Sequence, residues 1–552
     1  MRRCCQLLLL KFSTNGSDLM APTIFGLATF GFKFLFGPAA GRWMDRTDRM
    51  RVVRTGIALQ AVGVCAALGV LGLLVLQRDA APHGTLSSEA AIRMDDPAST
   101  RDLFPAGSRR GLTSAGGVPA ILLALMVLCG ILESLGALIS SVAVKKDWVP
   151  SIWAPKDPIL SWINTAMANI DLLAEIAGPL GGGVVLQSFG GDAALGFTLI
   201  GLANVVTFGL ELMLLRAVYY SNAQLQAPKP VPERAGGESA SSEGGHAAGG
   251  SGDDGCCAGM LGTWSAFLSH PSGIPLLVIS YSLLYFTVLS PHGVVLTAYL
   301  QTRGLSPPAL AAFRAAGALA GVGGMGAFGA LRERVGLRRL ASVHLWVLAT
   351  AVLVAALSFA ATLSQDGLSA PMAAFLGLVV LSRFGLYGFD VAVLQLQQVH
   401  VDETLRGSVG SVESSLCSMG TASVLVGTLV ASASGDPHAF DLLVFASAGF
   451  VGSAAIVYTA WVLFFHEHEH AHPLFEPAPE LHTSGGRIPG AQHKHTHQQR
   501  RELEESPGRT HKHLHFHPPW SHASNAHLKA VAHGHHGTHD SSAEYHHHGH
   551  SH

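Results

Sequence analysis

Four polar side chains lie in one apolar stretch of the sequence, residues 161–183, where together they could bind a cation. They are Asn164, Asn169, Asp171 and Glu175. Asp171 and Glu175 are four residues apart, so on a helix their carboxylates share one face. Like charges repel in an apolar environment unless a cation lies between them, and hard oxygen ligands suit divalent cations. The spacing predicts a metal site at Asp171 and Glu175 with a carbonyl from Asn164. The alternative is a protonated or salt-bridged structural pair.

An acidic residue also interrupts the apolar stretch at 383–407, which reads RFGLYGFDVAVLQLQQVHVDETLRG. An ionisable group inside a membrane span is costly, so Asp390 marks either a transport pathway or a structural pair. Further along, Glu413 and Cys417 are again four residues apart on an expected helix. We predict Glu413 as a weaker metal ligand, although helices rich in small residues usually reflect close packing.

A break in a helix is expected at Ser290-Pro291-His292-Gly293. Discontinuous helices near the membrane midplane often build substrate sites. Neutral imidazole is a good ligand for borderline divalent metals, which makes His292 a candidate ligand. The alternative, a hydrogen-bonded structural histidine, is equally consistent with the sequence.

The C-terminal segment is rich in histidine: 23 of the 30 histidines lie from His466 onward, so the enrichment belongs to this segment. Many of them are separated by a single other residue. Such histidine-rich segments bind zinc, nickel, copper or iron weakly and exchangeably. Low-complexity drift is the alternative. The predicted tail ligands are His466, His468, His470, His511, His513, His515, His546, His547 and His548.

The composition identifies the class of protein in which these residues lie. Hydrophobic residues make up 49% of the 552 and charged residues 13%, about half of the roughly 25% that is usual in soluble domains. The apolar runs are continuous rather than alternating, which favours membrane helices over a membrane β-barrel. We predict an all-α, polytopic membrane protein. The seven cysteines form no CxxC pair, the net charge of −2 gives no sign of a nucleic-acid partner, and no signal-peptide cleavage site is evident.

Eleven stretches are long and apolar enough to cross a bilayer, which takes about 20 residues each. Basic residues in alternate loops, at 45–54, 145–146 and 331–339, indicate that these loops face the cytosol, which also puts the C-terminus there. The expected spans lie near 19–42, 55–77, 118–144, 158–187, 191–216, 272–301, 307–331, 338–363, 371–399, 408–433 and 439–465.

We predict four regions along the chain. An N-terminal transmembrane lobe covers 1–216, a flexible cytosolic Gly/Ser linker 217–262, a C-terminal transmembrane lobe 263–465, and a disordered His-rich cytosolic tail 466–552. Five of the expected spans precede the linker and six follow it. Because transporters commonly have two six-helix halves, we expect a first helix to be missing from the front, with residues 1–12 as its end.

A set of short motifs follows a characteristic order along the chain. The motifs are Lys146-Asp147-Trp148, Asn164, Ile170-Asp171, Pro179, Tyr285 to Ser306 and Arg383 to Gly407. This order resembles that of ferroportins, the exporters of ferrous iron. The resemblance implies a major facilitator-like, two-lobed bundle with two halves of six helices, which exports divalent metal from the cytosol by alternating access. It also implies gate residues that close the cytosolic side as ion pairs. These are Asp45, Arg49, Asp147 and Arg383, with Asp390 on the same helix as Arg383.

The chain departs from the ferroportin pattern at the candidate site. Glu175 replaces an asparagine that the family carries four residues past its helix aspartate, which adds charge. Vertebrate ferroportins have an aspartate-cysteine pair at His292-Gly293, where the cysteine ligates metal and receives the peptide hormone hepcidin. Because Gly293 stands in that position, we expect no hepcidin binding. The family histidine of the eleventh helix has no counterpart, and Glu413 lies in that region instead.

The resemblance implies Fe²⁺ as the transported ion, with Co²⁺, Ni²⁺ or Zn²⁺ as further substrates and no bound cofactor. Two alternatives stay open: a zinc, nickel or cobalt transporter of the same fold, and a non-transporting membrane metal sensor that binds through its tail. No catalytic triad, phosphate loop or redox motif is present, so we do not expect an enzyme. The expected location is the plasma membrane or an endomembrane such as the vacuole or plastid envelope, with membrane lipid and divalent metal ions as partners.

Overall fold

The computed structural model describes most of the membrane region and a small part of the tail. The chain forms two compact units, Met1–Thr459 and Ala460–His552, and each is described separately. The predicted helix end at residues 1–12 lies outside the described part of the chain. The described residues are 20–80, 120–154, 157–188, 193–229, 256–291, 293–362, 369–434, 438–470 and 511–516.

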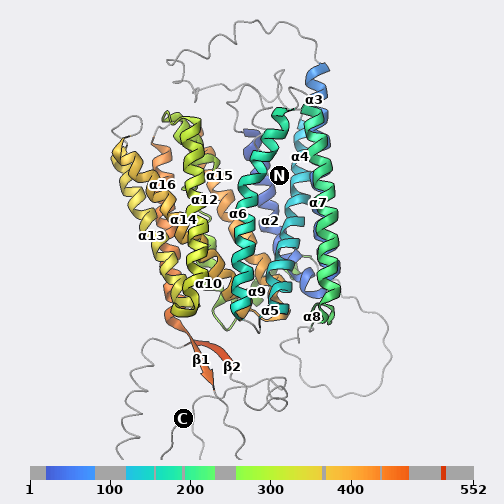
Figure 1. The fold of residues 1–552 in the computed structure, drawn as a ribbon, viewed down its shortest axis with the longest axis vertical. Helices are drawn as coiled ribbons and strands as arrows, with labels where there is room; N and C mark the ends of the chain where they lie inside the picture. Colours follow the sequence, from blue (N-terminus) through green and yellow to red (C-terminus); the bar gives the residue numbers. More distant parts are fainter. Residues whose placement is uncertain are drawn as a thin grey trace, which may run out of the picture. The chain divides into compact units, whose positions relative to one another are not determined.

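Helices dominate the first unit, because a backbone in a membrane must satisfy its hydrogen bonds internally (Figure 1). The first half contains α2 (Met20–Arg46), α3 (Arg49–Ala80), α4 (Ala120–Val142), the π-helix η4 (Ala143–Trp148), α5 (Val149–Trp153), α6 (Asp157–Ser188), α7 (Ala193–Ser221) and α8 (Ala223–Gln226). The second half contains α9 (Cys256–Leu268), α10 (Ile274–Leu283), α11 (Val294–Thr302), α12 (Pro307–Val335), α13 (Leu337–Thr362), α14 (Ala370–His400), the 3-10 turn η5 (Glu403–Leu405), α15 (Arg406–Ser434) and α16 (Ala439–Phe464).

The described helices follow the predicted spans closely. Nine helical segments of the described chain are long and apolar enough to cross a membrane, and α6 and the pair α10 and α11 occupy the other two predicted spans. The break within 272–301 is wider than the sequence indicates, since α10 ends at Leu283 and α11 begins at Val294. Pro291 has no backbone N–H and cannot continue a helix from within this interval. The first residues of the predicted linker are helical, because α7 continues to Ser221 and α8 follows it.

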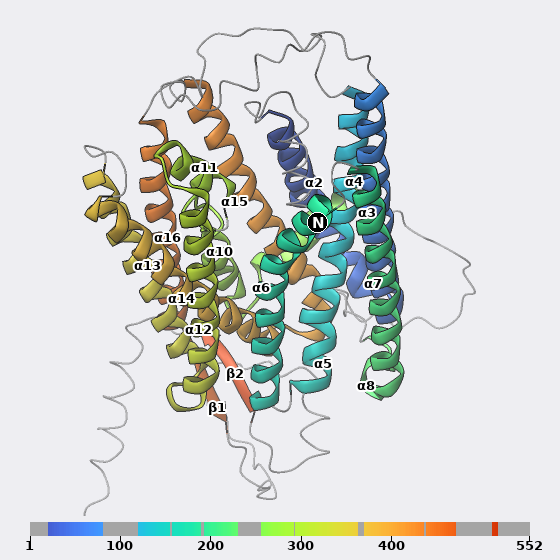
Figure 2. The ribbon, with the colours of Figure 1, turned by 45° about the horizontal axis from the view of Figure 1, so that its top comes forward.

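The helices gather in two groups, visible side by side in Figure 2. In the N-terminal lobe (α2 to α8), α3 packs against α4 and α7, and α2 packs against α4. In the C-terminal lobe (α9 to α16), α14 packs against α12 and α13. The lobes meet through α2 with α15, and through α6 with α12 and α14. The predicted all-α, two-lobed bundle is thereby confirmed.

The lobes approach each other most closely where α2 crosses α15. A Cβ atom at Gly41 would lie 2.6 Å from the carbonyl oxygen of Gly407, and one at Gly407 would lie 2.8 Å from the carbonyl oxygen of Gly41. Both distances are too short for a real side chain. The two glycines therefore permit a crossing in which small residues let helix backbones touch.

We call the end of the bundle beside this crossing the basic end. It contains the turn between α2 and α3 and the turn between α12 and α13, which both lie low in Figure 1. Five of its arginines are exposed: Arg46, Arg51, Arg54, Arg334 and Arg339. The charged loops that the sequence assigns to one side of the membrane therefore belong to one end of the bundle.

The second unit contains a two-stranded antiparallel sheet. Strand β1 (Phe465–His470) pairs with strand β2 (His511–Phe516). The sequence predicts disorder throughout 466–552, whereas these two segments form a ladder. Histidine alternates with other residues in both, which is the period of a strand. The tail ligands His546, His547 and His548 lie outside the described residues.

Candidate functional site

Asp45, an expected gate residue, joins the two lobes at the basic end. Its carboxylate accepts hydrogen bonds from the backbone N–H groups of Gly407 at 2.7 Å and Ser408 at 2.8 Å, and from the Ser408 hydroxyl at 2.6 Å. These donors belong to the first turn of α15, where unpaired N–H groups and the helix dipole favour an anion. Asp45 is 6% exposed. It bridges the lobes by capping a helix, not through the expected ion pair.

Arg49 and Asp147 form a buried pair beside this cap. The Arg49 Nε lies 3.4 Å from Asp147 Oδ2, and the Arg49 side chain is 1% exposed. The same guanidinium forms an ion pair with Glu403, in the turn η5 of the C-terminal lobe. Arg49 thus bridges the lobes through an ion pair. Glu403 is a partner that the sequence analysis missed, although it lies in the charged end of the 383–407 stretch.

The first residues of the predicted linker cover this pair. Lys229 Nζ lies 3.0 Å from Asp147 Oδ2, and Arg49 donates a hydrogen bond to the Ala227 carbonyl oxygen at 3.0 Å. Leu225 is 1% exposed. The segment is therefore a packed part of the basic end. Its composition gave no signal of this, because a short helix with one apolar anchor looks like linker sequence.

Arg383, the fourth expected gate residue, lies away from this network in this structure. It is 4% exposed and donates hydrogen bonds to the Leu289 carbonyl oxygen at 2.7 Å and to the Ser382 hydroxyl at 3.2 Å. Its position along α14, which ends at His400, puts it roughly 25 Å along the helix axis from that end. The guanidinium therefore supports the break between α10 and α11.

The π-helix η4 carries three charged residues that reach three different partners. Lys145, Lys146 and Asp147 follow one another in its sequence. Asp147 pairs with Arg49, as described above, and the two lysines reach α6 and α15. π-Helical turns are rare and occur frequently at functional sites. The sequence analysis used the lysines to assign topology and Lys146 as part of a motif, and it missed their contacts.

Asn164 is engaged in an amide pair between the lobes. Its Nδ2 donates to Gln398 Oε1 at 2.6 Å, and Gln398 Nε2 donates to Asn164 Oδ1 at 3.1 Å. Gln398 Nε2 also donates to the Lys145 carbonyl oxygen at 2.6 Å. Asn164 is fully buried. Its carbonyl is committed to Gln398, so the predicted role beside Asp171 as a metal ligand does not fit this arrangement.

Asp171 forms an ion pair with Lys145, and its side chain is 58% exposed. Glu175 lies one turn further along α6 and is half-buried. Within the described residues, no group of three or more His, Cys, Asp or Glu side chains is arranged to hold a metal ion. In this conformation Asp171 is therefore salt-bridged, which is the alternative that the sequence left open.

Glu413 is held by a lysine and a glutamine rather than lying next to other acids. Lys146 Nζ lies 2.6 Å from Glu413 Oε1 and donates to Gln397 Oε1 at 2.8 Å. Gln397 also donates to Glu413. Lys146 belongs to the N-terminal lobe and the other two to the C-terminal lobe. The sequence marked Glu413 but gave no indication of these partners.

Asp390 contacts the broken helix of its own lobe rather than the gate at the basic end. It accepts a hydrogen bond from the Tyr281 hydroxyl, and the hydroxyls of Tyr281 and Tyr285 are 3.1 Å apart. Tyr281 lies in the last turn of α10 and Tyr285 just after its end, and the sequence analysis missed their contacts with Asp390 and with each other. His292, the candidate ligand of the break, lies outside the described residues.

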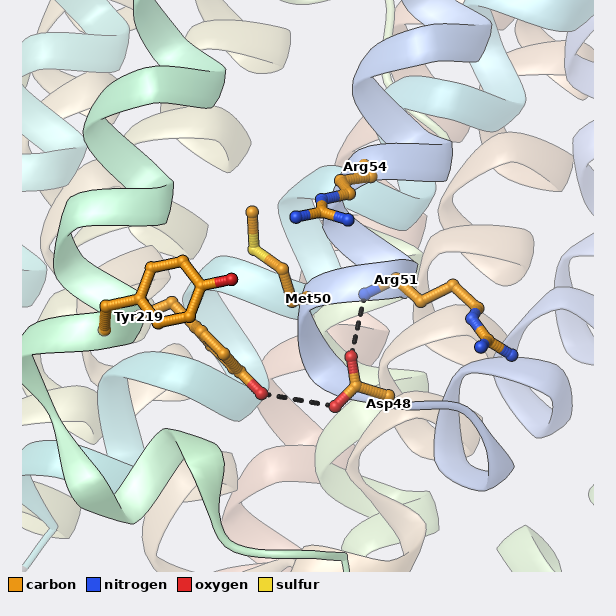
Figure 3. Close-up of a pocket in the computed structure, with 6 residues that line it drawn as sticks. Asp48, Met50, Arg51, Arg54 and Tyr219 are labelled. Carbon is orange, nitrogen blue, oxygen red and sulfur yellow. Dashed lines mark hydrogen bonds between the residues drawn. The ribbon is translucent and has the colours of Figure 1, made fainter.

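A separate pocket of about 240 Å³ opens between the start of α3 and the end of α7. The Tyr219 hydroxyl donates to Asp48 at 3.3 Å, and Asp48 accepts from the Arg51 backbone N–H at 3.1 Å (Figure 3). These contacts cap α3 and tie it to α7 inside the N-terminal lobe. The lining residues are Asp48, Met50, Arg51, Arg54, Tyr219 and Tyr220. No predicted ligand is among them, so the pocket is no part of the candidate pathway.

In the second unit, the predicted tail ligands occupy matching positions on the two strands. Residues two apart along a strand lie on the same face of a sheet. All six histidines of β1 and β2 named in the sequence analysis therefore belong to one face of the ladder. The register pairs His466 with His515, His468 with His513 and His470 with His511.

Comparison with known proteins identifies the family. The model of the family described as Ferroportin1 (FPN1) matches residues 8–451. The chain belongs to the Ferroportin1 family. Ferreportin from Bdellovibrio bacteriovorus is 30% identical over 78% of this chain and 83% of its own length. Solute carrier family 40 member 1 from Oryza sativa is 26% identical over 82% and 85%, and ferroportin from Canis lupus familiaris is 22% identical over 80% and 85%.

Solved structures agree with this assignment to the Ferroportin1 family. The crystal structure of a bacterial homologue of the iron transporter ferroportin, in an outward-facing state with soaked iron, matches with a TM-score of 0.62. It is 26% identical, and the match covers 82% of this chain and 93% of that one. The major facilitator proton:xylose symporter XylE matches with a TM-score of 0.53 at 11% identity, over 83% of this chain and 90% of that one, which supports the fold alone.

The Ferroportin1 family and this fold are those of membrane transporters, so the expectation that the chain is not an enzyme is confirmed. With nine apolar helices among the described residues, this ferroportin-family protein is an integral, multi-pass membrane protein.

Proposed function

We propose that this protein exports Fe²⁺ from the cytosol by alternating access. The observation that carries the proposal is the buried polar join at the basic end, in a chain of the Ferroportin1 family. Asp45 and Arg49 each reach from the N-terminal lobe to the C-terminal lobe, and such contacts break and re-form when two lobes rock about a central site. A relative named Ferreportin and a similar structure of a bacterial homologue of an iron transporter support iron as the cargo.

The basic end faces the cytosol in this proposal. Arginines concentrate on the cytosolic side of membrane proteins, and Arg46, Arg51, Arg54 and Arg334 are all exposed at this end. When the two lobes are in contact at this end, the carrier is closed to the cytosol and open to the other side. The likeness to a homologue in an outward-facing state is consistent with this direction. The C-terminal tail is then cytosolic.

The metal ligands we propose are Asp171 and Glu175 in one lobe, with His292 and Glu413 in the other. Fe²⁺ accepts carboxylate oxygen and imidazole nitrogen. The Asp171 side chain is more than half exposed, so an incoming cation can reach it and compete with Lys145. Asn164 is left out of this set because Gln398 occupies it. Co²⁺, Ni²⁺ and Zn²⁺ are the alternative substrates.

Metal uptake into proteoliposomes that contain a metal-sensitive dye tests the proposal. Fe²⁺, Co²⁺, Ni²⁺ and Zn²⁺ are compared in wild type and in Asp171→Asn. We expect Fe²⁺ flux in wild type and at least a tenfold loss in the variant, because removing a charged ligand costs more than the ~1.4 kcal/mol that corresponds to a factor of ten.

The matched control for this experiment is Asp441→Asn. Asp441 is also a helical acid, 8% exposed, but it pairs with His438 at 2.9 Å within the C-terminal lobe. The Fe²⁺ flux of the Asp441→Asn variant should stay at the wild-type level. Equal flux in wild type and Asp171→Asn would remove Asp171 from the site, and absence of flux for every metal would contradict export itself.

The histidine tail is proposed to hold metal near the transporter. Histidines opposite one another on neighbouring strands are within reach of a shared ion, and the register of β1 and β2 brings three such pairs together. Deleting residues 466–552 should lower the number of Ni²⁺ ions bound per chain in equilibrium dialysis and leave the initial Fe²⁺ flux nearly unchanged. A membrane metal sensor predicts the opposite pattern, in which tail deletion abolishes function and Asp171→Asn does not.

We also propose that hepcidin does not bind this carrier. The vertebrate family binds the hormone through a cysteine, and Gly293 stands in that position. Hepcidin added to the proteoliposomes should leave the Fe²⁺ flux unchanged; inhibition at hormone concentrations that saturate a vertebrate ferroportin would contradict this.

A further inference from the structure

The two neighbouring lysines of η4 serve different lobes. Lys145 pairs with Asp171 on α6 of its own lobe, and Lys146 pairs with Glu413 on α15 of the other lobe. The η4 turn is π-helical, and such a turn inserts an extra residue into an α-helix, which changes the directions of the side chains that follow. The irregular turn thus gives two of the three candidate metal-binding acids, Asp171 and Glu413, a cation each.

Lys146 is the more enclosed of the two. Its side chain is 14% exposed and that of Glu413 is 12% exposed, whereas Lys145 and Asp171 are 30% and 58% exposed. Lys146 Nζ contacts Glu413 at 2.6 Å and Gln397 at 2.8 Å. Gln397 in turn donates to Glu413. One lysine therefore compensates the Glu413 charge, and one amide donates a further hydrogen bond to the carboxylate.

The stem of Lys146 also fits closely against α15. A Cβ atom at Gly410 would lie 2.8 Å from Lys146 Cδ and 2.9 Å from Val142 Cγ1. On the side of this contact that faces Arg406, the space enclosed is only about 10 Å³, about enough for a single water molecule. A hydrated metal ion therefore does not fit into this space beside Lys146 while the lobes are joined.

We propose that Lys146 is a tethered cation that displaces the transported metal from Glu413 when the basic end closes. Glu413 buried without a cation is strongly unfavourable, and Glu413 with both a lysine and a divalent ion would leave an excess of positive charge in a buried site. Metal at Glu413 and closure through Lys146 therefore exclude each other. Closing the basic end drives the ion off Glu413 toward the open side.

The displacement of metal from Glu413 rests on the proposed function. The contact that Lys146 makes between the lobes does not depend on it. The probe is single-molecule FRET on the full chain between dyes at Arg51→Cys and Arg334→Cys, with the native cysteines replaced by serine. These positions are exposed on opposite lobes at the basic end. Co²⁺ is titrated, and the readouts are the fraction of closed molecules without metal and the Co²⁺ concentration of half-maximal opening. The same titration on the chain without residues 466–552 separates any effect of metal bound by the histidine tail.

In Lys146→Gln we expect at least a tenfold lower closed-to-open ratio without metal and at least a tenfold lower half-effect concentration of Co²⁺, because the competing cation is gone. Lys146→Arg keeps the charge and should stay close to wild type. Adding Glu413→Gln to Lys146→Gln should abolish the gain in Co²⁺ sensitivity. Gly410→Ala changes no charge but pushes the lysine stem away, so it should shift both readouts in the direction of Lys146→Gln.

An unchanged closed fraction and unchanged Co²⁺ sensitivity in Lys146→Gln, with Co²⁺ still acting on wild type, would overturn this inference and leave the proposed function intact. If Co²⁺ moves neither wild type nor any variant and no metal flux is found in proteoliposomes, the displacement and the proposed function fall together.

Discussion

Asp45→Ala is expected to open the basic end, with the closed-to-open ratio reduced about 100-fold, or ~3 kcal/mol. The carboxylate holds three donors of the first turn of α15, two of them backbone N–H groups. Hydrogen bonds to charged groups contribute about 1.5–3 kcal/mol each, and losing a helix cap costs about 0.5–2 kcal/mol. The losses are not additive, because water partly replaces the carboxylate once the lobes separate. FRET between the two basic-end dyes measures the shift.

The comparison that isolates the contact between the lobes is Asp48→Ala. Asp48 also caps a helix, accepting the Arg51 backbone N–H at 3.1 Å, but both residues belong to the N-terminal lobe. Its loss should leave the closed fraction unchanged. Asp45→Asn keeps one acceptor oxygen without the charge and should give an intermediate value. If Asp45→Ala and Asp48→Ala behave alike, the cap on α15 does not hold the lobes together.

Arg49→Gln is expected to reduce Fe²⁺ flux at least tenfold while the protein still inserts and folds. Arg49 is buried and pairs with both Asp147 and Glu403. Removing one partner of a buried ion pair typically costs about 3–5 kcal/mol, because the remaining charge is left uncompensated. Lys229 stays beside Asp147 at 3.0 Å, which offsets part of the cost in the N-terminal lobe. Glu403, across the lobe boundary, loses its ion pair as well, but its side chain is 37% exposed and stays partly hydrated. The expected loss of flux comes from the lost contact between the lobes.

Three variants separate this effect from a general loss of charge. Arg54→Gln removes an exposed arginine of the same helix and should leave the flux unchanged. Arg49→Lys keeps the charge but lacks the planar fork that reaches two acids at once, so its flux should recover only in part. Combining Arg49→Gln with Asp147→Asn should cost less than the sum of the single changes. Wild-type flux in Arg49→Gln would show that the pair is not needed for the transport cycle.

The sequence predicted the contacts of some polar residues better than those of others. Arg49 and Asp147 are close in the structure because Arg49 begins α3 and Asp147 lies in η4, which pack against each other, a relation that the resemblance already implied. Arg383 was assigned to the same gate, yet its position well inside α14 puts it beside the break between α10 and α11. The resemblance named these residues without determining all of their partners.

The sequence by itself determined the membrane class, the helical fold and most helix bounds. Hydropathy and chain length decide these locally, since about 20 apolar residues in a row have few other stable states. It also identified the acids on α6, α14 and α15, because a charge inside an apolar run is visible without any partner.

Only the tertiary structure decided what those polar groups contact. Asp45 caps a helix that begins at Arg406, far away in the sequence, and Lys145 and Lys146 reach different lobes. These contacts depend on how each helix is rotated about its axis and where it crosses its neighbours, as at Gly41 and Gly407. Such rotations are fixed by the packing of whole helix surfaces, which no short stretch of sequence contains.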